Sequence, residues 1–224
     1  NNYWYALSKR ARVLAIAKDR VKPKEIKRIE DLAKSKWKGK ICTRKGSHVY
    51  NRALLSSIIA ANGKTSAVKW VKGLISNLAR RPQGNDRAQI KAIAQGVCDV
   101  AIINHYYFFK MKNSKNQTQR DWVNSIQILF LNQGDRGNHI NVSGIGVAKH
   151  SKNKRNAIRL MEFLSNDFAQ NLYAKINYEY PVNKSAKPSV EVLSLGKFKE
   201  DKLPIGLIAK LAPDAQKIIN RVGW

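Results

Sequence analysis

Short apolar runs alternate along the chain with longer segments in which apolar residues recur every three to four positions. The short runs predict buried strands at residues 12–16, 40–43, 97–103, 126–130 and 142–148. Helical spacing predicts helices at residues 25–34, 50–61, 66–78, 86–95, 153–164, 167–175, 205–211 and 213–222. The polar stretch 112–121 predicts a surface loop. This alternation is typical of an α/β protein, and we expect mostly parallel strand pairing.

The composition is that of a folded protein with an unusually basic surface. Hydrophobic residues make up 43% of the chain, and no apolar run approaches the roughly 18 residues that span a bilayer. The formal net charge is +27, from 42 Lys and Arg against 15 Asp and Glu. A surface for nucleic acid or anionic lipid is one interpretation. Because the basic residues are scattered along the chain, we favour a generally basic, solvated surface.

Two cysteines, Cys42 and Cys98, lie in two of the predicted buried strands. Their separation excludes the CxxC spacing of zinc and redox motifs. An even number of cysteines fits one disulfide between neighbouring strands of an exported protein, and two buried thiols are the alternative. We favour the disulfide.

The sequence contains no arrangement of residues that is typical of an enzyme. It has no HExxH, GxSxG or P-loop spacing, and its paired carboxylates lie in polar stretches. The four histidines lie in unrelated segments, at His48, His105, His139 and His150. We therefore expect a binding protein and not an enzyme.

Four aromatic residues, Tyr106 to Phe109, follow the predicted strand 97–103 directly. On a continuing strand, Tyr106 and Tyr107 would point to opposite faces. In the first turn of a helix they diverge by only about 100°, and both phenol oxygens can meet at the carboxyl end of the sheet, where α/β folds bind ligands. A plain aromatic core cluster is the alternative.

Paired phenol oxygens would suit ferric iron. A phenol ionises near pH 10, so it binds a metal only where a strong positive charge displaces its proton. Hard oxygen donors match hard cations, and Fe(III) is the natural partner of several phenolates. A helix N-terminus adds a modest stabilisation of the phenolate.

The run Asn104-His105-Tyr106-Tyr107 after a Cys-Asp-Val-Ala-Ile strand resembles the Asn-x-Tyr-Tyr signature of the periplasmic ferric-ion-binding proteins. These are the solute receptors of bacterial iron ABC importers. Other segments resemble the family in the same order, at residues 6–13, 31–42, 50–51, 81–86, 136–144, 177–182 and 223–224. The resemblance implies a fold like that of the type II periplasmic binding proteins, with two lobes, a hinge and a ligand cleft.

The resemblance also implies a division of the chain. Residues 1–10 would cross the hinge, 11–136 would form the C-terminal lobe, 137–187 the returning part of the N-terminal lobe, and 188–224 helices that pack on the C-terminal lobe. The family pattern begins before Asn1, so we expect the first lobe to be incomplete in this sequence. Further metal ligands would come from that missing part.

Carried over residue by residue, the resemblance implies that Tyr106 and Tyr107 are metal ligands and that Tyr50 is a third phenolate. Arg10 matches an arginine that holds a carbonate-like synergistic anion in part of the family, with a hinge-region salt bridge as the alternative. The candidate polar groups around the anion are Asn104 and Asp86.

The implied function is that of a monomeric periplasmic receptor, which captures Fe(III), closes by hinge motion and docks on an ABC permease of the inner membrane. We expect iron affinity to fall with pH, because protons compete for the phenolates. A receptor of the same fold for an inorganic anion or a polyamine is the first alternative. A basic nucleic-acid-binding module is the second, and it leaves the tyrosines unexplained.

Overall fold

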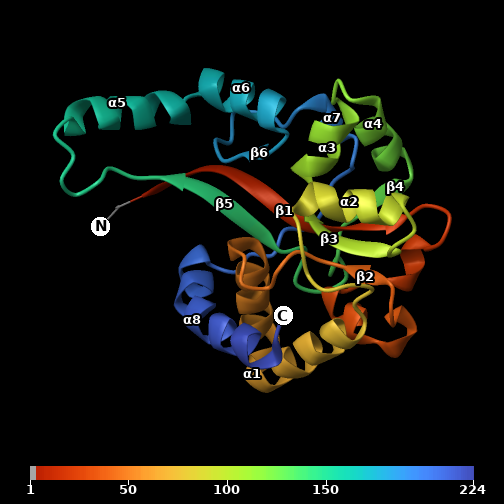
Figure 1. Cartoon of the computed structure of the whole chain (residues 1–224). Coiled ribbons are helices and arrows are strands. Elements are labelled where there is room, and N and C mark those ends of the chain that lie inside the picture. Colours follow the sequence, from red (N-terminus) through yellow and green to blue (C-terminus); the bar gives the residue numbers. More distant parts are fainter. Residues whose placement is uncertain (1–3) are drawn as a thin grey trace. The chain divides into compact units, whose positions relative to one another are not determined.

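Residues 4–224 are described by a computed structural model, and they form two compact units (Figure 1). Of the described residues, unit 1 comprises 4–10 and Ile140–Lys197, and unit 2 comprises Ala11–His139 and Phe198–Trp224. The first three residues of the predicted hinge segment 1–10 lie outside the described residues. The assignment of the chain to two receptor lobes stays a prediction.

The long strand β1, Tyr5–Ala17, contributes residues to both units. The other elements of unit 2 are β2 (Ile41–Cys42), α1 (Val49–Ser76), α2 (Asp86–Ala94), β3 (Val100–Asn104), α3 (Tyr106–Lys112), α4 (Gln117–Asn124), β4 (Ile126–Leu129) and α8 (Ile205–Val222). Those of unit 1 are β5 (Ile140–Ile145), α5 (Lys154–Ser165), α6 (Asp167–Asn177), β6 (Tyr180–Pro181) and α7 (Val190–Leu193).

The sheet of unit 2 has the strand order β2-β3-β1-β4. Strands β2 and β3, which are joined by a helical crossover, form a parallel pair with Cys42 opposite Ala101. The long strand β1 runs antiparallel to β3 and β4, with Arg12 opposite Asn104 and Leu14 opposite Leu129. The expectation of mostly parallel pairing is therefore wrong. Alternating elements indicate an α/β class, but they do not say which strands become neighbours.

Helices cover both faces of this sheet. Leu14 and Ile16 of β1 belong to a buried cluster with residues of α1 and α8, whereas Val13 and Ala15 are also buried and point to the opposite face. Figure 1 shows α1 and α8 on one side of the sheet and α2 on the other. The strands of unit 2 are thus buried on both sides.

Several predicted helices have different forms in the structure. The α1 segment is interrupted at Gly63, whose φ of 77° is left-handed, as expected from the predicted stop at that residue. Residues predicted as a helix at 25–34 instead form short 3-10 turns at Pro23–Glu25, Ile29–Ala33 and Ser35–Trp37. Helix α4 begins inside the predicted loop 112–121, where Asn116 accepts a hydrogen bond from the N–H of Gln119.

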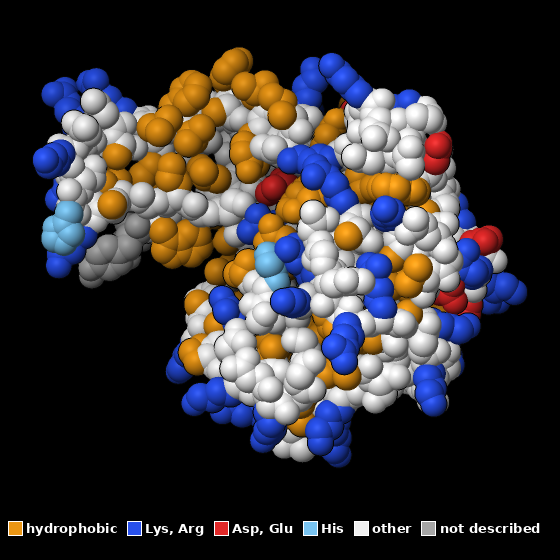
Figure 2. Space-filling model, in the orientation of Figure 1, with side chains coloured by type: hydrophobic (Ala, Val, Ile, Leu, Met, Phe, Trp, Pro, Cys, Tyr) orange, Lys and Arg blue, Asp and Glu red, His pale blue; other side chains and the backbone are white. Residues whose placement is uncertain are grey.

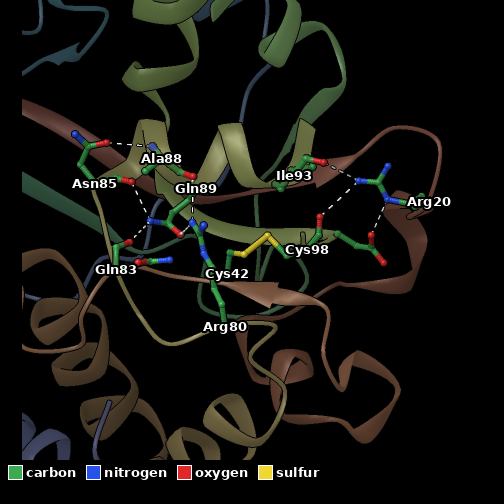
Figure 3. Close-up of a disulfide and its surroundings, with 10 residues drawn as sticks. Arg20, Cys42, Arg80, Gln83, Asn85, Ala88, Gln89, Ile93 and Cys98 are labelled. Atoms are coloured by element: carbon green, nitrogen blue, oxygen red, sulfur yellow. Dashed lines mark hydrogen bonds and ion pairs between the residues drawn. A yellow bond between two sulfur atoms is a disulfide. The ribbon is translucent and has the colours of Figure 1, made fainter. Parts of the chain in front are cut away.

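Cys42 and Cys98 form the expected disulfide, with a Cα–Cα distance of 5.9 Å (Figure 3). Both residues are buried, and the bridge ties β2 to the segment that leads into β3. Arg20 lies at the same end of the sheet, where its guanidinium donates to the carbonyl oxygens of Ile93 at 2.9 Å and Cys98 at 3.5 Å. The start of β3 is thus held covalently and by hydrogen bonds.

In unit 1, the first half of β1 pairs with β5 and runs antiparallel to β6, with Ser8 opposite Pro181. Helix α5 has no buried residue. Apolar side chains gather on the visible face of α5 and α6 (Figure 2), and the exposed ones are Ile158, Leu160, Phe163, Phe168, Leu172 and Ile176. Among the described helices, none combines the length and apolarity that crossing a membrane requires.

Candidate metal site

The tyrosine pair begins helix α3 directly after strand β3. All five residues of β3 are buried, and His105 makes the turn between the two elements. The Nδ1 atom of His105 accepts a hydrogen bond from the backbone N–H of Ala11 at 3.1 Å. The backbone N–H of His105 donates to the carbonyl oxygen of Ala11, also at 3.1 Å. The predicted change from strand to helix is confirmed. The ring centroids of Tyr106 and Tyr107 lie 4.3 Å apart.

Tyr50 lies in the first turn of α1 and reaches the same place. His48 caps this helix: its Nδ1 accepts from the N–H of Tyr50 at 3.3 Å, and its ring meets the Tyr50 ring edge-on at 4.5 Å. Burial and the nearby charge of Arg44 lower the pKa of His48, which favours the neutral, accepting ring. The hydroxyl oxygens of Tyr50 and Tyr106 lie 3.2 Å apart. Two helix starts therefore bring phenol oxygens together.

The phenols of Tyr106 and Tyr107 are protonated at neutral pH in the metal-free protein. Burial raises the pKa of Tyr106 above its ordinary value of 10.0, and hydrogen bonds to Tyr107 and Tyr50 raise it further. Burial also raises the pKa of Tyr107, although its hydrogen bond with Tyr106 opposes the change. A cation that binds here as a phenolate complex has to displace protons. Trivalent cations are suited to do so.

A buried polar network lies beneath the tyrosines. Arg12 of β1 donates to Asp86 Oδ2 at 2.7 Å, to Asn51 Oδ1 at 2.7 Å and to Asn104 Oδ1 at 3.2 Å. Asp86 also accepts from the N–H of Asn104 at 2.7 Å and from the guanidinium of Arg44 at 3.1 Å. Asn85 caps α2, so Asp86 stands in the first helical turn with its carboxylate turned inward. The network joins five segments of unit 2.

Cations surround the phenol rings. The distances from the guanidinium carbon or ammonium nitrogen to the ring centroid are 5.6 Å for Arg12 and 5.1 Å for Arg44 over Tyr50, 5.5 Å for Arg87 over Tyr107, and 5.4 Å for Lys110 over Tyr106. A cation over an aromatic face is attracted by the ring, and more strongly by a phenolate. These cations therefore favour negative charge on the phenol oxygens and oppose the effect of burial, which favours the neutral phenols of Tyr106 and Tyr107.

Three buried N–H donors of this network have no acceptor among the described residues. They are the Nε of Arg12, the Nε of Arg44 and the Nδ2 of Asn104. Buried donors normally have partners, and a water molecule or an oxyanion supplies acceptors of the kind they lack. The donor set therefore fits an oxyanion.

The structure brings together five of the six candidate site residues. Tyr50, Tyr106, Tyr107, Asn104 and Asp86 all belong to unit 2 and are joined by the contacts described above. The sixth, Arg10, belongs to unit 1, where its guanidinium donates to Ser143 Oγ at 2.8 Å and to the carbonyl of Val142 at 3.1 Å. Its predicted role in binding an anion stays a prediction.

Sequence reasoning missed two arginines of the site. Arg12 is a charged residue within an apolar strand pattern, and such a residue needs a buried partner. The sequence pattern could therefore have indicated a buried ion pair at Arg12. Arg44 lies between a short strand and a helix start, in a chain with many other basic residues. Nothing in its local sequence separates it from them, and only its contact with Asp86 identifies it.

Known proteins resemble the chain over nearly its whole length. The sequence profile of a family described as bacterial extracellular solute-binding protein matches residues 1–197. Iron uptake protein A1 of Synechocystis sp. is 40% identical over 221 residues, which are 99% of this chain and 61% of that protein. The chain thus spans less than two thirds of the length of this curated relative.

Solved structures share the fold. A ferric binding protein from Campylobacter jejuni has a TM-score of 0.95 and 40% identity, and a Trichodesmium protein in complex with iron and citrate has a TM-score of 0.94 and 41% identity. Each match covers 99% of this chain and 70% of the other. The predicted α/β fold, like that of the type II periplasmic binding proteins, is confirmed.

Proposed function

Because the chain belongs to the bacterial extracellular solute-binding protein family, we propose that it is a receptor for ferric iron. The observation that carries the proposal is the meeting of three tyrosines, with the Tyr50 and Tyr106 oxygens 3.2 Å apart and the Tyr106 and Tyr107 rings 4.3 Å apart. The names of the relatives agree with it, since they describe iron uptake and ferric binding. Its role is binding and delivery, not catalysis.

Tyr50, Tyr106 and Tyr107 bind the iron as phenolates in this proposal. Three phenolates balance the charge of Fe(III), which favours binding in a chain with a formal net charge of +27. Hard anionic oxygen is the donor that ferric iron prefers. Because burial raises the pKa of Tyr106 and Tyr107 in the metal-free protein, uptake of iron releases protons and weakens as the pH falls.

A synergistic oxyanion completes the site. The buried donors of Arg12, Arg44 and Asn104 that lack acceptors support such an anion, and one related structure contains citrate with its iron. Carbonate has the same oxygen chemistry and is the anion that we expect from the family resemblance. The roles of Arg10 and of Asp86 beside the anion stay predictions of that resemblance.

The proposed setting is the periplasm. The family is described as extracellular and solute-binding. From the family resemblance, we propose a permease of the inner membrane as the partner and a monomeric receptor. Closure of two lobes by hinge motion would enclose the iron and present a shape that the permease recognises.

Absorption spectroscopy of the iron-loaded protein tests the proposal. Ferric phenolate complexes have a charge-transfer band in the visible range, so the loaded protein should be coloured. The double variant Tyr106→Phe, Tyr107→Phe should lose the band and release iron to a chelator that the wild type resists. Tyr5→Phe is the matched control, because Tyr5 is exposed and outside the tyrosine cluster. A colourless loaded protein, or iron retention that the double variant leaves intact, would refute the proposal.

A second measurement separates the proposal from a receptor for another ligand. Thermal unfolding is followed with ferric citrate, with phosphate and with spermidine, since a ligand that binds only the folded protein raises its melting temperature. Relative to an iron-free citrate control, we expect a rise in melting temperature with the iron salt and none with the other two. A rise with spermidine or phosphate alone would point to the other receptor class.

A further inference from the structure

One buried ion pair anchors both segments that carry the tyrosines. Arg12 and Asp86 lie 2.7 Å apart, with 2% and 0% of their side chains exposed. Arg12 reaches Asn51, the neighbour of Tyr50, and Asp86 accepts the backbone N–H of Asn104, which ends the strand before α3. The spacing between the start of α1 and the start of α3 therefore depends on this pair.

Arg44 connects the ion pair to the ring of Tyr50. Its guanidinium donates to Asp86 Oδ1 at 3.1 Å and lies 5.1 Å from the Tyr50 ring centroid. Its side chain is 12% exposed, so solvent screens the interaction only in part. The main chain of the same residue accepts from the side chain of Asn51 at 2.9 Å, which holds the loop against the start of α1.

The charges of this group do not cancel. Arg12 and Arg44 both face the Tyr50 ring, and Asp86 is the carboxylate that contacts both of them. Two guanidinium groups against one carboxylate leave one net positive charge beside the ring. An anionic oxygen bound to a metal at this place is attracted by that charge.

We propose that Arg44, held in place by Asp86, is a positioning residue of the ferric site: it fixes the ring of Tyr50 and holds a positive charge beside the oxygen that binds iron. The inference rests on the proposed function and adds an outer residue to that site. Groups that orient metal ligands from outside the coordination shell commonly change metal affinity by about 10- to 100-fold when they are removed. Arg44 acts through Tyr50 and does not itself bind the metal.

The test compares three variants of the iron-loaded chain with the wild type. Arg44→Gln removes the charge, Arg44→Lys keeps a charge and one donor for Asp86, and Lys72→Gln removes one charge from an exposed position on α1. Two quantities are measured: the wavelength of the charge-transfer band, and iron affinity by competition with a chelator. The band is recorded only on folded, loaded molecules, so a loss of stability alone does not move it.

Arg44→Gln should weaken iron binding about tenfold and shift the band to longer wavelength. The shift is expected because a phenolate without the nearby cation gives up its electron at lower energy. Arg44→Lys should restore most of the band position, and Lys72→Gln should match the wild type in both measurements.

Two outcomes would overturn the inference while the proposed function stands. One is an Arg44→Gln band and affinity equal to those of Lys72→Gln. The other is a shift in Arg44→Lys as large as that in Arg44→Gln, because the charge would then have no part in it. A wild-type protein that binds iron without a visible band would overturn the phenolate site itself and this inference with it.

Discussion

Removal of the disulfide between Cys42 and Cys98 should lower the free energy of unfolding of unit 2 by about 4 kcal/mol. The bridge joins residues with a sequence separation of 56. In the unfolded chain it excludes every conformation in which the two residues lie apart. For a loop of this length, the chain-entropy relation gives an entropy change of the unfolded chain of about −14 cal/mol/K, which corresponds to about 4 kcal/mol of stability at 25 °C.

The double variant Cys42→Ala, Cys98→Ala is the suitable perturbation. Both cysteines are buried beside β2 and β3, where serine would place two hydroxyl groups without assured partners. Alanine leaves only a small cavity in place of the sulfur atoms, and this cavity adds about 1 kcal/mol or less to the loss of stability. For a unit of this size, a loss of 4 kcal/mol should lower the melting temperature by about 8–16 °C.

Urea unfolding followed by tryptophan fluorescence measures the change. Trp37, Trp70 and Trp224 are buried in the core of unit 2, so their emission reports on that unit. The variant should unfold at a lower urea concentration than the oxidised wild type, and reductant should shift the wild type to the variant's midpoint without moving the variant. A difference below about 1 kcal/mol between oxidised wild type and variant would refute the entropy argument, because it would mean that the unfolded chain is already constrained.

The remaining predictions address the site and the surface. Asp86→Asn leaves two arginines without their buried carboxylate, so unit 2 should lose about 3–5 kcal/mol in the same urea assay; a loss below about 1 kcal/mol would show that the pair is dispensable. Burial raises the pKa of Tyr106 and Tyr107, so the neutral forms of these side chains stabilise the folded, metal-free protein. This stabilisation is present below pH about 10 and is lost as the pH rises through the folded-state pKa. Iron affinity should rise with pH over the neutral range, and an affinity in chelator competition that does not change with pH would contradict proton release from the phenols. The side chains of Phe163 and Phe168 are 50% and 68% exposed. Replacing either one with serine should change the free energy of unfolding by less than about 0.5 kcal/mol and should reduce binding of a fluorescent hydrophobic dye. Unchanged dye binding would mean that the dye binds to another apolar surface.

Local pattern was sufficient for the parts of the protein that depend on neighbouring residues. The apolar run before Asn104 and the aromatic run after it predicted a strand that passes into a helix at Tyr106, and the structure has this arrangement. Gly63 was expected to end a helix, and its left-handed φ of 77° interrupts α1. Such features follow from the conformational preferences of a few adjacent residues, which the sequence displays directly.

Local pattern failed where two conformations differ little in local preference. Residues 25–34 have helical spacing, yet they form 3-10 turns, in which the side chain of Asp31 accepts from the N–H groups of Lys27 and Arg28 at 2.9 Å. In the polar stretch 112–121, the cap by Asn116 starts a helix that hydrophobic spacing does not reveal. Here side-chain hydrogen bonds to the backbone decide the outcome.

The sequence by itself determined the α/β class, the strand-to-helix placement of Tyr106 and Tyr107, and the two cysteines available for a bridge. Only the tertiary structure decided that β1 pairs antiparallel with its neighbours, that Tyr50 comes within 3.2 Å of Tyr106, and that Arg44 lies over the Tyr50 ring. The physical reason is the distance along the chain. The oxygens of Tyr50 and Tyr106 belong to residues 56 positions apart. Their meeting depends on how the helices pack on the sheet and on the buried Arg12–Asp86 pair, and neither leaves a pattern in the residues next to the tyrosines.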